Sequence, residues 1–225
     1  MKNFPVTCID NFYKDPDKIR EYALSLEYFQ NDGRYPGKTT DHLSNLNPYL
    51  FNQFCCKLMG IYFDFTVSWA NWDIHTYFQL IDSQHDDPLS PKNSGLIHLD
   101  DDKVMGGIIY LTPDIDASCG TSIFKINDDI NRVHRLSDTD KKIKSDFYKD
   151  GIDNNYDSMI LNHNSKFKET GRFYNEYNRL VAFDGQTYHG VNSFYTKSQR
   201  LTQVFFVNDL TTNSSPPMVR VNSIL

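Results

Sequence analysis

From residue 65 onward the sequence is dominated by short runs of β-branched and aromatic residues, separated by clusters of Gly, Asn, Asp and Pro. Residues of the first kind favour strands, and the clusters between them favour turns. Many short strands joined by polar turns are typical of a sandwich or barrel, so we predict a mainly β fold with flanking helices. The predicted strands are Phe65–Trp69, Ile74–Leu80, Gly95–Leu99, Gly107–Thr112, Thr121–Ile126, Arg179–Phe183 and Leu201–Val207.

Two helices are predicted ahead of these strands. Asp15 and Asn47 each stand immediately before a proline, which combines a capping side chain with a residue whose fixed φ suits the first helical turn. Apolar residues then recur with the spacing of one helix face. The residues expected to face the core are Ile19, Ala23 and Leu26 in the first helix and Phe51, Phe54, Cys55 and Leu58 in the second, which ends at Gly60.

The length of 225 residues fits a single domain with a sizeable core. We expect residues 1–64 to form an N-terminal helical scaffold, residues 65–210 to form the β core, and residues 211–225 to form a tail. Within the core, residues 127–178 are rich in Asn, Asp and charged side chains, so we interpret them as a solvated insertion with a short helix around Asp138–Phe147. This insertion could form a lid or a substrate wall.

Composition and charge narrow the choice of partners. Hydrophobic residues make up 39% of the chain, enough for a core, and the net charge of −6 does not favour nucleic-acid binding. No apolar run approaches the roughly 20 residues that a membrane helix requires, so no membrane partner is expected. The N-terminal sequence lacks the apolar core of a secretory signal, and the cysteines show no CxxC spacing, so we expect a reducing, cytoplasmic location. The cysteines are Cys8, Cys55, Cys56 and Cys119.

Polar residues interrupt the apolar pattern of "SGLIHLDDDKVMGGIIYLTPD", which begins at Ser94. His98 and Asp100 are two residues apart, so in a strand both side chains point to the same face, while Ile97 and Leu99 point to the other. Two such polar groups beside an apolar strand need a partner. Asp101 and Asp102 are expected to cover a solvated turn, where an acidic rim could favour a basic substrate.

A second interruption lies in "NRLVAFDGQTYHGVNSFYTKSQRLTQVFFVND". His189 follows a predicted strand and a polar turn, and the spacing to Arg200 indicates a hairpin. Arg200 opens a strand that is largely apolar on both faces, so we expect this strand to be covered on each side. A guanidinium in such a place must be paired with an anion, because burying it alone costs several kcal/mol. No acidic residue is an obvious mate, and a bound carboxylate would serve.

His98, Asp100 and His189 together supply two imidazoles and one carboxylate. This set leaves open positions on an octahedral ion, which suits the oxygen chemistry of Fe(II), whereas a tetrahedral zinc site with one water is the alternative. An HxD pair alone is weak support for a metal site. An HxD pair followed by a lone His in a later strand and then by an Arg is far more specific.

The segments "HLD", "GGIIYLTPD", "GTSIF", "RLVAFDGQTYHGV" and "RLTQVFFV", in this order, resemble the prolyl-hydroxylase-like branch of the 2-oxoglutarate/Fe(II)-dependent oxygenases. The resemblance covers residues 74–208, most of the chain. It implies a double-stranded β-helix, a jelly-roll or cupin-like core in which two sheets face one another with the metal at the open end.

The same resemblance implies a catalytic site. Fe(II) would be held by His98, Asp100 and His189. The cosubstrate 2-oxoglutarate would be bound by Arg200, Thr202 and Tyr110, with Arg200 pairing with its distal carboxylate. The reaction implied is hydroxylation of a small-molecule or peptidyl substrate by O2, with release of succinate and CO2. Relatives that halogenate replace the carboxylate found here as Asp100.

Simpler interpretations exist for each residue. His98 with Asp100 could be a structural pair at a strand end, and Arg200 could belong to a surface ion pair. Thr202 could be a β-branched filler, and Tyr110 a core tyrosine. The alternative functions are a non-catalytic β-barrel module that binds a metal or ligand, and a zinc hydrolase of the cupin type. The hydrolase would need a general base, which the sequence does not show at a convincing spacing.

Overall fold

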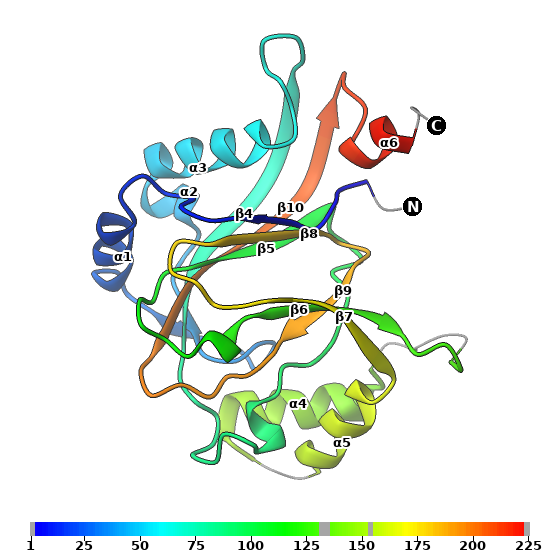
Figure 1. Ribbon diagram of the computed structural model, residues 1–225. Coiled ribbons are helices and arrows are strands. Elements are labelled where there is room, and N and C mark those ends of the chain that lie inside the picture. The colour runs from blue at the N-terminus through cyan, green and yellow to red at the C-terminus, as the bar shows by residue number, and fades with distance from the viewer. Residues whose placement is uncertain (1–2, 131–135, 153–154, 223–225) are drawn as a thin grey trace.

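The computed structural model describes residues 3–130, 136–152 and 155–222, and it is mainly β with helices outside two antiparallel sheets (Figure 1). In chain order the elements are β1 (Thr7–Ile9), α1 (Pro16–Leu24), β2 (Phe29–Gln30), β3 (Lys38–Thr39), α2 (Leu43–Leu46), α3 (Pro48–Gly60), β4 (Ala70–Ile81), η1 (Pro91–Asn93), β5 (Met105–Tyr110), η2 (Ala117–Cys119), β6 (Thr121–Ile126), α4 (Asp138–Asp150), α5 (Tyr156–Asn164), β7 (Phe167–Phe173), β8 (Leu180–Asp184), β9 (Tyr188–Val191), β10 (Arg200–Thr212) and α6 (Pro217–Asn222). The larger sheet has the order β1-β8-β5-β10-β4-β3-β2, and the smaller one has the order β7-β6-β9.

Strand β10 lies in the middle of the larger sheet, between β5 and β4, and both of its faces are covered as predicted. On the outer face Leu201 and Phe205 are buried in one cluster with residues of α1 and α3, such as Phe54. On the inner face Arg200 and Thr202 are also buried. The inner face turns toward the smaller sheet, as Figure 1 shows, so any cavity between the sheets is lined by the inner residues of β10.

The two predicted helices are confirmed, with their caps. Asp15 Oδ1 accepts a hydrogen bond from Lys18 N at 3.4 Å, and Asn47 Oδ1 accepts one from Leu50 N at 3.0 Å. Each proline occupies the first helical turn, where its missing N–H costs nothing. Of the predicted core-facing residues, Ala23, Phe54, Cys55 and Leu58 are buried, and Ile19, Leu26 and Phe51 are partly buried against the same core.

Five of the seven predicted strands correspond to strands of the structure. β6 matches Thr121–Ile126 residue for residue, and β4, β5, β8 and β10 overlap four further predictions. The predicted strand Phe65–Trp69 is wrong, because these residues form a turn and β4 begins only at Ala70. Asp64 explains the difference: its Oδ1 accepts hydrogen bonds from both the backbone and the hydroxyl of Thr66, which competes with strand pairing.

Residues 127–178 contain more regular secondary structure than the predicted solvated insertion with one short helix. The helix predicted around Asp138–Phe147 is confirmed as α4, but α5 and β7 were not predicted, and β7 pairs with β6 along its length. α4 and α5 lie together at the end of the molecule opposite α3 (Figure 1). They share a small apolar cluster that includes Phe147, Tyr156 and Ile160.

Residues 1–64 supply α1, α2 and α3 and also three strands that the sequence pattern did not indicate. β1 pairs with β8 at one edge of the larger sheet, and the β2–β3 hairpin extends the other edge beyond β4. All four cysteines are free. Among the described residues, no helix combines the length and the apolar character needed to cross a bilayer.

Candidate metal centre

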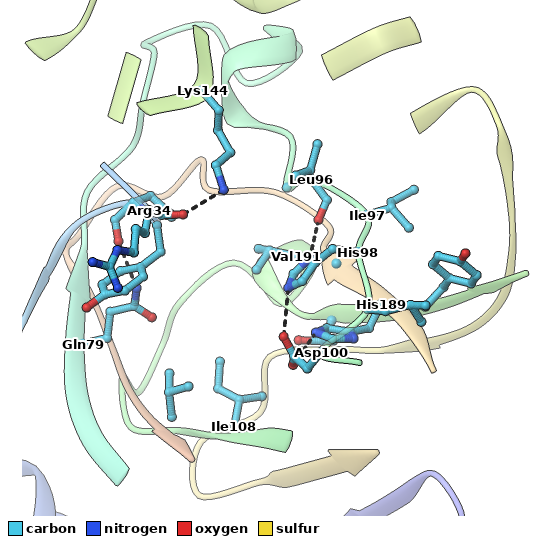
Figure 2. A pocket seen from close by; sticks show the side chains of 18 of the residues that line it. Arg34, Gln79, Leu96, Ile97, His98, Asp100, Ile108, Lys144, His189 and Val191 are labelled. Atoms are coloured by element: carbon cyan, nitrogen blue, oxygen red, sulfur yellow. Dashed lines mark hydrogen bonds and ion pairs between the residues drawn. The ribbon is translucent and has the colours of Figure 1, made fainter. Parts of the chain in front are cut away.

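His98, Asp100 and His189 converge at one point between the sheets (Figure 2). His98 Nε2 lies 3.7 Å from Asp100 Oδ1, and His189 Nε2 lies 3.4 Å from Asp100 Oδ2. One ligand atom from each of the three residues lies within 4.8 Å of the others. Within the described residues no other group of three or more His, Cys, Asp or Glu side chains is arranged in this way. The geometry can therefore hold a metal ion.

The backbone brings the two histidines together through a single antiparallel bridge. His98 N donates to His189 O at 2.9 Å, and His189 N donates to His98 O at 3.0 Å. His189 lies in β9, whereas His98 and Asp100 lie in the segment between η1 and β5. The predicted alternation still holds locally, because both His98 and Asp100 point toward His189.

The segment Gly95–Leu99 is not a regular strand, and this prediction is wrong apart from the bridge at His98. Side chains of α5 bind the backbone groups that another strand would use. Asn164 Oδ1 accepts from Ile97 N at 3.1 Å, and Asn164 Nδ2 donates to Gly95 O at 2.9 Å. His163 Nε2 is 2.7 Å from Ile97 O. The insertion therefore helps to fix the segment that carries His98.

Each histidine ring is oriented by a backbone carbonyl. His98 Nδ1 is 2.8 Å from Leu96 O, and His189 Nδ1 is 2.9 Å from Thr187 O. Because a carbonyl only accepts hydrogen bonds, Nδ1 carries the proton and Nε2 presents its lone pair toward Asp100, which is the tautomer that binds metals. Burial is the main cause that holds the pKa of His189 well below 6.5, and the nearby His98 lowers it further, so this imidazole stays neutral. Burial raises the pKa of Asp100. A divalent cation would offset the cost of the buried carboxylate.

One residue of the site was missed by the sequence prediction. A Cβ atom added to Gly106 in β5 would stand 3.1 Å from Asp100 Oδ2, so the absence of a side chain leaves room for this carboxylate. The available signal was the pair Gly106–Gly107 inside an otherwise apolar strand, since glycine there often marks a close approach by another group.

Arg200 lies in the wall of the same cavity and is 1% exposed. Its Nε, Nη1 and Nη2 atoms have no hydrogen-bond partner among the described residues, and neither has the hydroxyl of Thr202. The guanidinium lies over the ring of Tyr110, 5.7 Å from its centroid, and the Tyr110 hydroxyl donates to Thr121 Oγ1 at 2.8 Å. Burying a cation without a counter-ion costs free energy, so this end of the cavity favours the binding of an anion.

His189 and Arg200 do not belong to one hairpin, contrary to the prediction. β9 pairs with β6 in the smaller sheet, whereas β10 pairs with β4 and β5 in the larger one, so the connection crosses from sheet to sheet. The crossing puts the histidine and the arginine on opposite walls of one cavity of about 840 Å³. Its lining also includes apolar residues from both sheets, among them Ile108, Phe183, Val191, Val204 and Phe206.

A family model described as "Family of unknown function (DUF6445)" matches residues 1–200. No curated protein matches the sequence. The fold is similar to that of HygX from Streptomyces hygroscopicus, solved with nickel, 2-oxoglutarate and hygromycin B, with a TM-score of 0.54, 10% identity, and coverage of 91% of this chain and 83% of that chain.

Two further solved structures are similar. EvdO2 from Micromonospora carbonacea var. aurantiaca, complexed with 2-oxoglutarate, has a TM-score of 0.54 and 11% identity over 95% of this chain and 90% of that chain. A prolyl hydroxylase from Trichoplax adhaerens, in complex with a hypoxia inducible factor peptide fragment, has a TM-score of 0.50 and 11% identity over 90% and 82% of the two chains. The chain therefore belongs to the DUF6445 family, and its fold resembles that of the 2-oxoglutarate/Fe(II)-dependent oxygenases, as its sequence motifs predicted.

Proposed function

We propose that this protein is an Fe(II)- and 2-oxoglutarate-dependent oxygenase that hydroxylates a small molecule or a peptidyl side chain with O2, releasing succinate and CO2. The observation that carries the proposal is the presence, in one cavity, of the His98–Asp100–His189 group and the buried guanidinium of Arg200 without a partner among the described residues. A group of metal-binding side chains alone would also be expected in a metal-dependent hydrolase, and a buried arginine alone is found in many anion-binding sites. Together they match an ion and a dicarboxylic acid held side by side.

In this proposal His98, Asp100 and His189 bind the metal. Two imidazoles and one carboxylate leave up to three positions of an octahedral ion open, as the oxygen chemistry of Fe(II) requires. When bound, the iron with 2-oxoglutarate and O2 supplies the oxidising power for C–H hydroxylation. The hydrogen bonds from the Nδ1 atoms to Leu96 O and Thr187 O fix the ring orientations before the metal arrives.

Arg200 and Thr202 are proposed to bind the distal carboxylate of 2-oxoglutarate. The planar fork of the guanidinium matches a carboxylate in a bidentate pair, and the Thr202 hydroxyl is available as a further donor. Tyr110 lies opposite Thr202 in the β5–β10 register, with its ring under the guanidinium. Because the Tyr110 hydroxyl already donates to Thr121, we assign Tyr110 the role of supporting Arg200 through its ring.

The apolar lining of the cavity contributes by excluding water. Ile108, Val204 and Phe206 lie on the inner face of the larger sheet and line the same cavity as His98, Asp100 and His189, so charges at the site act in a low-dielectric environment. The facing antiparallel sheets support a double-stranded β-helix as the finer description of this core, within one oxygenase domain that includes the N-terminal helices and the insertion.

The test is the visible charge-transfer band that forms when Fe(II) and 2-oxoglutarate are added without oxygen. We expect the band in the wild type, and we expect His189→Ala to abolish it because one of three ligands is lost. His75→Ala is the matched control, since His75 is exposed and lies outside the cavity lining, and it should keep the band. The oxygenase proposal is wrong if zinc stabilises the protein while 2-oxoglutarate changes neither its melting nor its spectrum.

A further inference from the structure

The cavity has a second cationic feature, which the proposed chemistry does not use. Lys144 of α4 extends into the cavity near the loop of residues 31–37, and its Nζ donates to Arg34 O at 2.9 Å (Figure 2). The Lys144 side chain is half-buried, and no carboxylate among the described residues pairs with it. An ammonium group has three donors, so two remain for a ligand.

Two neighbouring lysines of α4, Lys141 in the cavity lining and Lys142 outside it, pair with acids of the same helix. Both are exposed, and each pairs with an acid three or four positions away, which is ordinary for a solvated helix surface. The pairs are Lys141–Asp138 at 2.9 Å and Lys142–Asp146 at 2.7 Å.

The acid that stands four residues before Lys144 is engaged elsewhere. Asp140 Oδ2 accepts a hydrogen bond from Ser137 Oγ at 2.8 Å, and Asp140 N donates to the same hydroxyl at 3.1 Å. These two hydrogen bonds cap the start of α4 and engage one oxygen of the Asp140 carboxylate. Lys144 is therefore the lysine of α4 that faces the cavity without an intrahelical acid.

The loop of residues 31–37 holds Lys144 in place. Gly33 has a φ of +85°, and a Cβ atom added to it would overlap the carbonyl oxygen of Ser145 in α4. Ser145 Oγ donates to Asp32 O at 3.1 Å, and Asn31 Oδ1 accepts from Gly33 N at 2.8 Å. The loop is thus packed directly on the helix, and Arg34 O fixes the position of the ammonium group.

Apolar residues line the same cavity as Lys144. Leu96, Leu136 and Tyr148 line the cavity and belong to one hydrophobic cluster with α4. Burial lowers the pKa of Lys144, and no acid compensates for this cost. The guanidinium of Arg34 also lines the cavity but pairs with Asp32 at 2.9 Å, so it adds little net charge.

We propose that the substrate carries an anionic group, a carboxylate or a phosphate, which binds Lys144 while the apolar part of the substrate contacts Leu96, Leu136 and Tyr148. The inference rests on the proposed function in one respect, namely that the C–H bond to be oxidised faces the His98–Asp100–His189 group.

The test measures how strongly the cavity prefers a charged probe. Phenylacetate, phenyl phosphate and the uncharged phenylacetamide are titrated calorimetrically into protein saturated with Mn(II) and 2-oxoglutarate, so that Arg200 is already occupied. We expect at least one anionic probe to bind about tenfold tighter than the amide to the wild type, the effect of one charge-assisted hydrogen bond. Which anion shows the preference distinguishes a carboxylate substrate from a phosphate.

Variants of α4 decide whether Lys144 is the cause. Lys144→Gln should reduce the preference to less than about twofold, whereas Lys144→Arg, which keeps the charge, should retain most of it. Lys142→Gln is the matched control on the exposed face of the same helix and should behave as the wild type. Circular dichroism melting of each variant verifies that the fold is intact.

The outcomes separate this inference from the proposed function. If 2-oxoglutarate binds but the wild type shows no preference, or if Lys144→Gln keeps the preference, the inference is overturned and the oxygenase proposal stands. If 2-oxoglutarate does not bind, the oxygenase proposal fails, and the difference between wild type and Lys144→Gln with metal alone still decides the role of Lys144.

Discussion

Replacing Arg200 by methionine should make the ligand-free protein more stable. The guanidinium is 1% exposed, and its donors have no partner among the described residues, so the folded state bears most of the cost of burying this charge. Exchanging a buried charge for an apolar side chain of similar length gains roughly 1–4 kcal/mol. Loss of the contact with the Tyr110 ring subtracts about 0.5–2 kcal/mol. The expected net gain is about 1–2 kcal/mol in the free energy of unfolding.

The assay is urea denaturation with and without saturating 2-oxoglutarate and Mn(II). At a ligand concentration of about 100 times Kd, the wild type should gain about 2.7 kcal/mol from binding, and Arg200→Met should gain almost nothing. The variant should therefore be the more stable protein without ligand and the less stable one with it. Because each kcal/mol shifts Tm by about 2–4 °C in a chain of this size, melting curves would show the same reversal.

Arg179→Met is the control for removing an arginine from the sheet region. Arg179 is paired with Asp10 through Nη2 and Oδ2 at 3.0 Å, so its removal should not stabilise the protein and should leave the response to 2-oxoglutarate unchanged. The reasoning is refuted if Arg200→Met destabilises the ligand-free protein by more than about 1 kcal/mol, a typical cost of losing a satisfied hydrogen bond. It is also refuted if 2-oxoglutarate stabilises wild type and variant equally.

Two further predictions concern the His98–Asp100–His189 group. Because the pKa of His189 is held below 6.5, the unfolded chain binds a proton as the pH falls below that value while the folded chain does not, so stability should fall by up to about 1.4 kcal/mol per pH unit. His189→Gln should flatten this slope in urea titrations between about pH 7 and 5, whereas His75→Gln should not. Gly106→Ala should weaken Mn(II) binding about tenfold by displacing Asp100, and Gly171→Ala, where an added Cβ meets nothing within 4 Å, should leave it unchanged.

The residues of the metal group and Arg200 could be predicted because each conflicts with its local pattern. A polar or charged residue in an apolar stretch needs a partner, and the order of an HxD pair, a lone His and an Arg favoured a ligand as that partner. The segment Gly95–Leu99 could not be predicted correctly, since several of its backbone groups bind side chains of Asn164 and His163, far along the chain in a stretch predicted to be solvated.

Long-range pairing limited the prediction in other places too. β7 reads as "FKETGRF", in which polar side chains occupy most positions, and it is a strand because β6 supplies its partner. The spacing between His189 and Arg200 suits neighbouring strands, but spacing alone does not say which sheet each strand joins. Lys144 was likewise hidden in a charged stretch, where only the packing of the loop of residues 31–37 on α4 sets it apart from its neighbours.

The two faces of β10 show why the unpaired state of Arg200 points to a ligand. On the outer face Gln203 is fully buried and satisfied, since its Oε1 accepts from the Tyr13 hydroxyl at 2.6 Å and its Nε2 donates to Thr76 Oγ1 at 3.0 Å. On the inner face of the same strand, Arg200 and Thr202 have no such partners among the described residues. The same strand thus satisfies the buried Gln203 with partners from the protein but provides no acid opposite the buried Arg200 among the described residues. Arg200 instead lines the cavity that also contains the His98–Asp100–His189 group, so we expect its partner to be a bound anion.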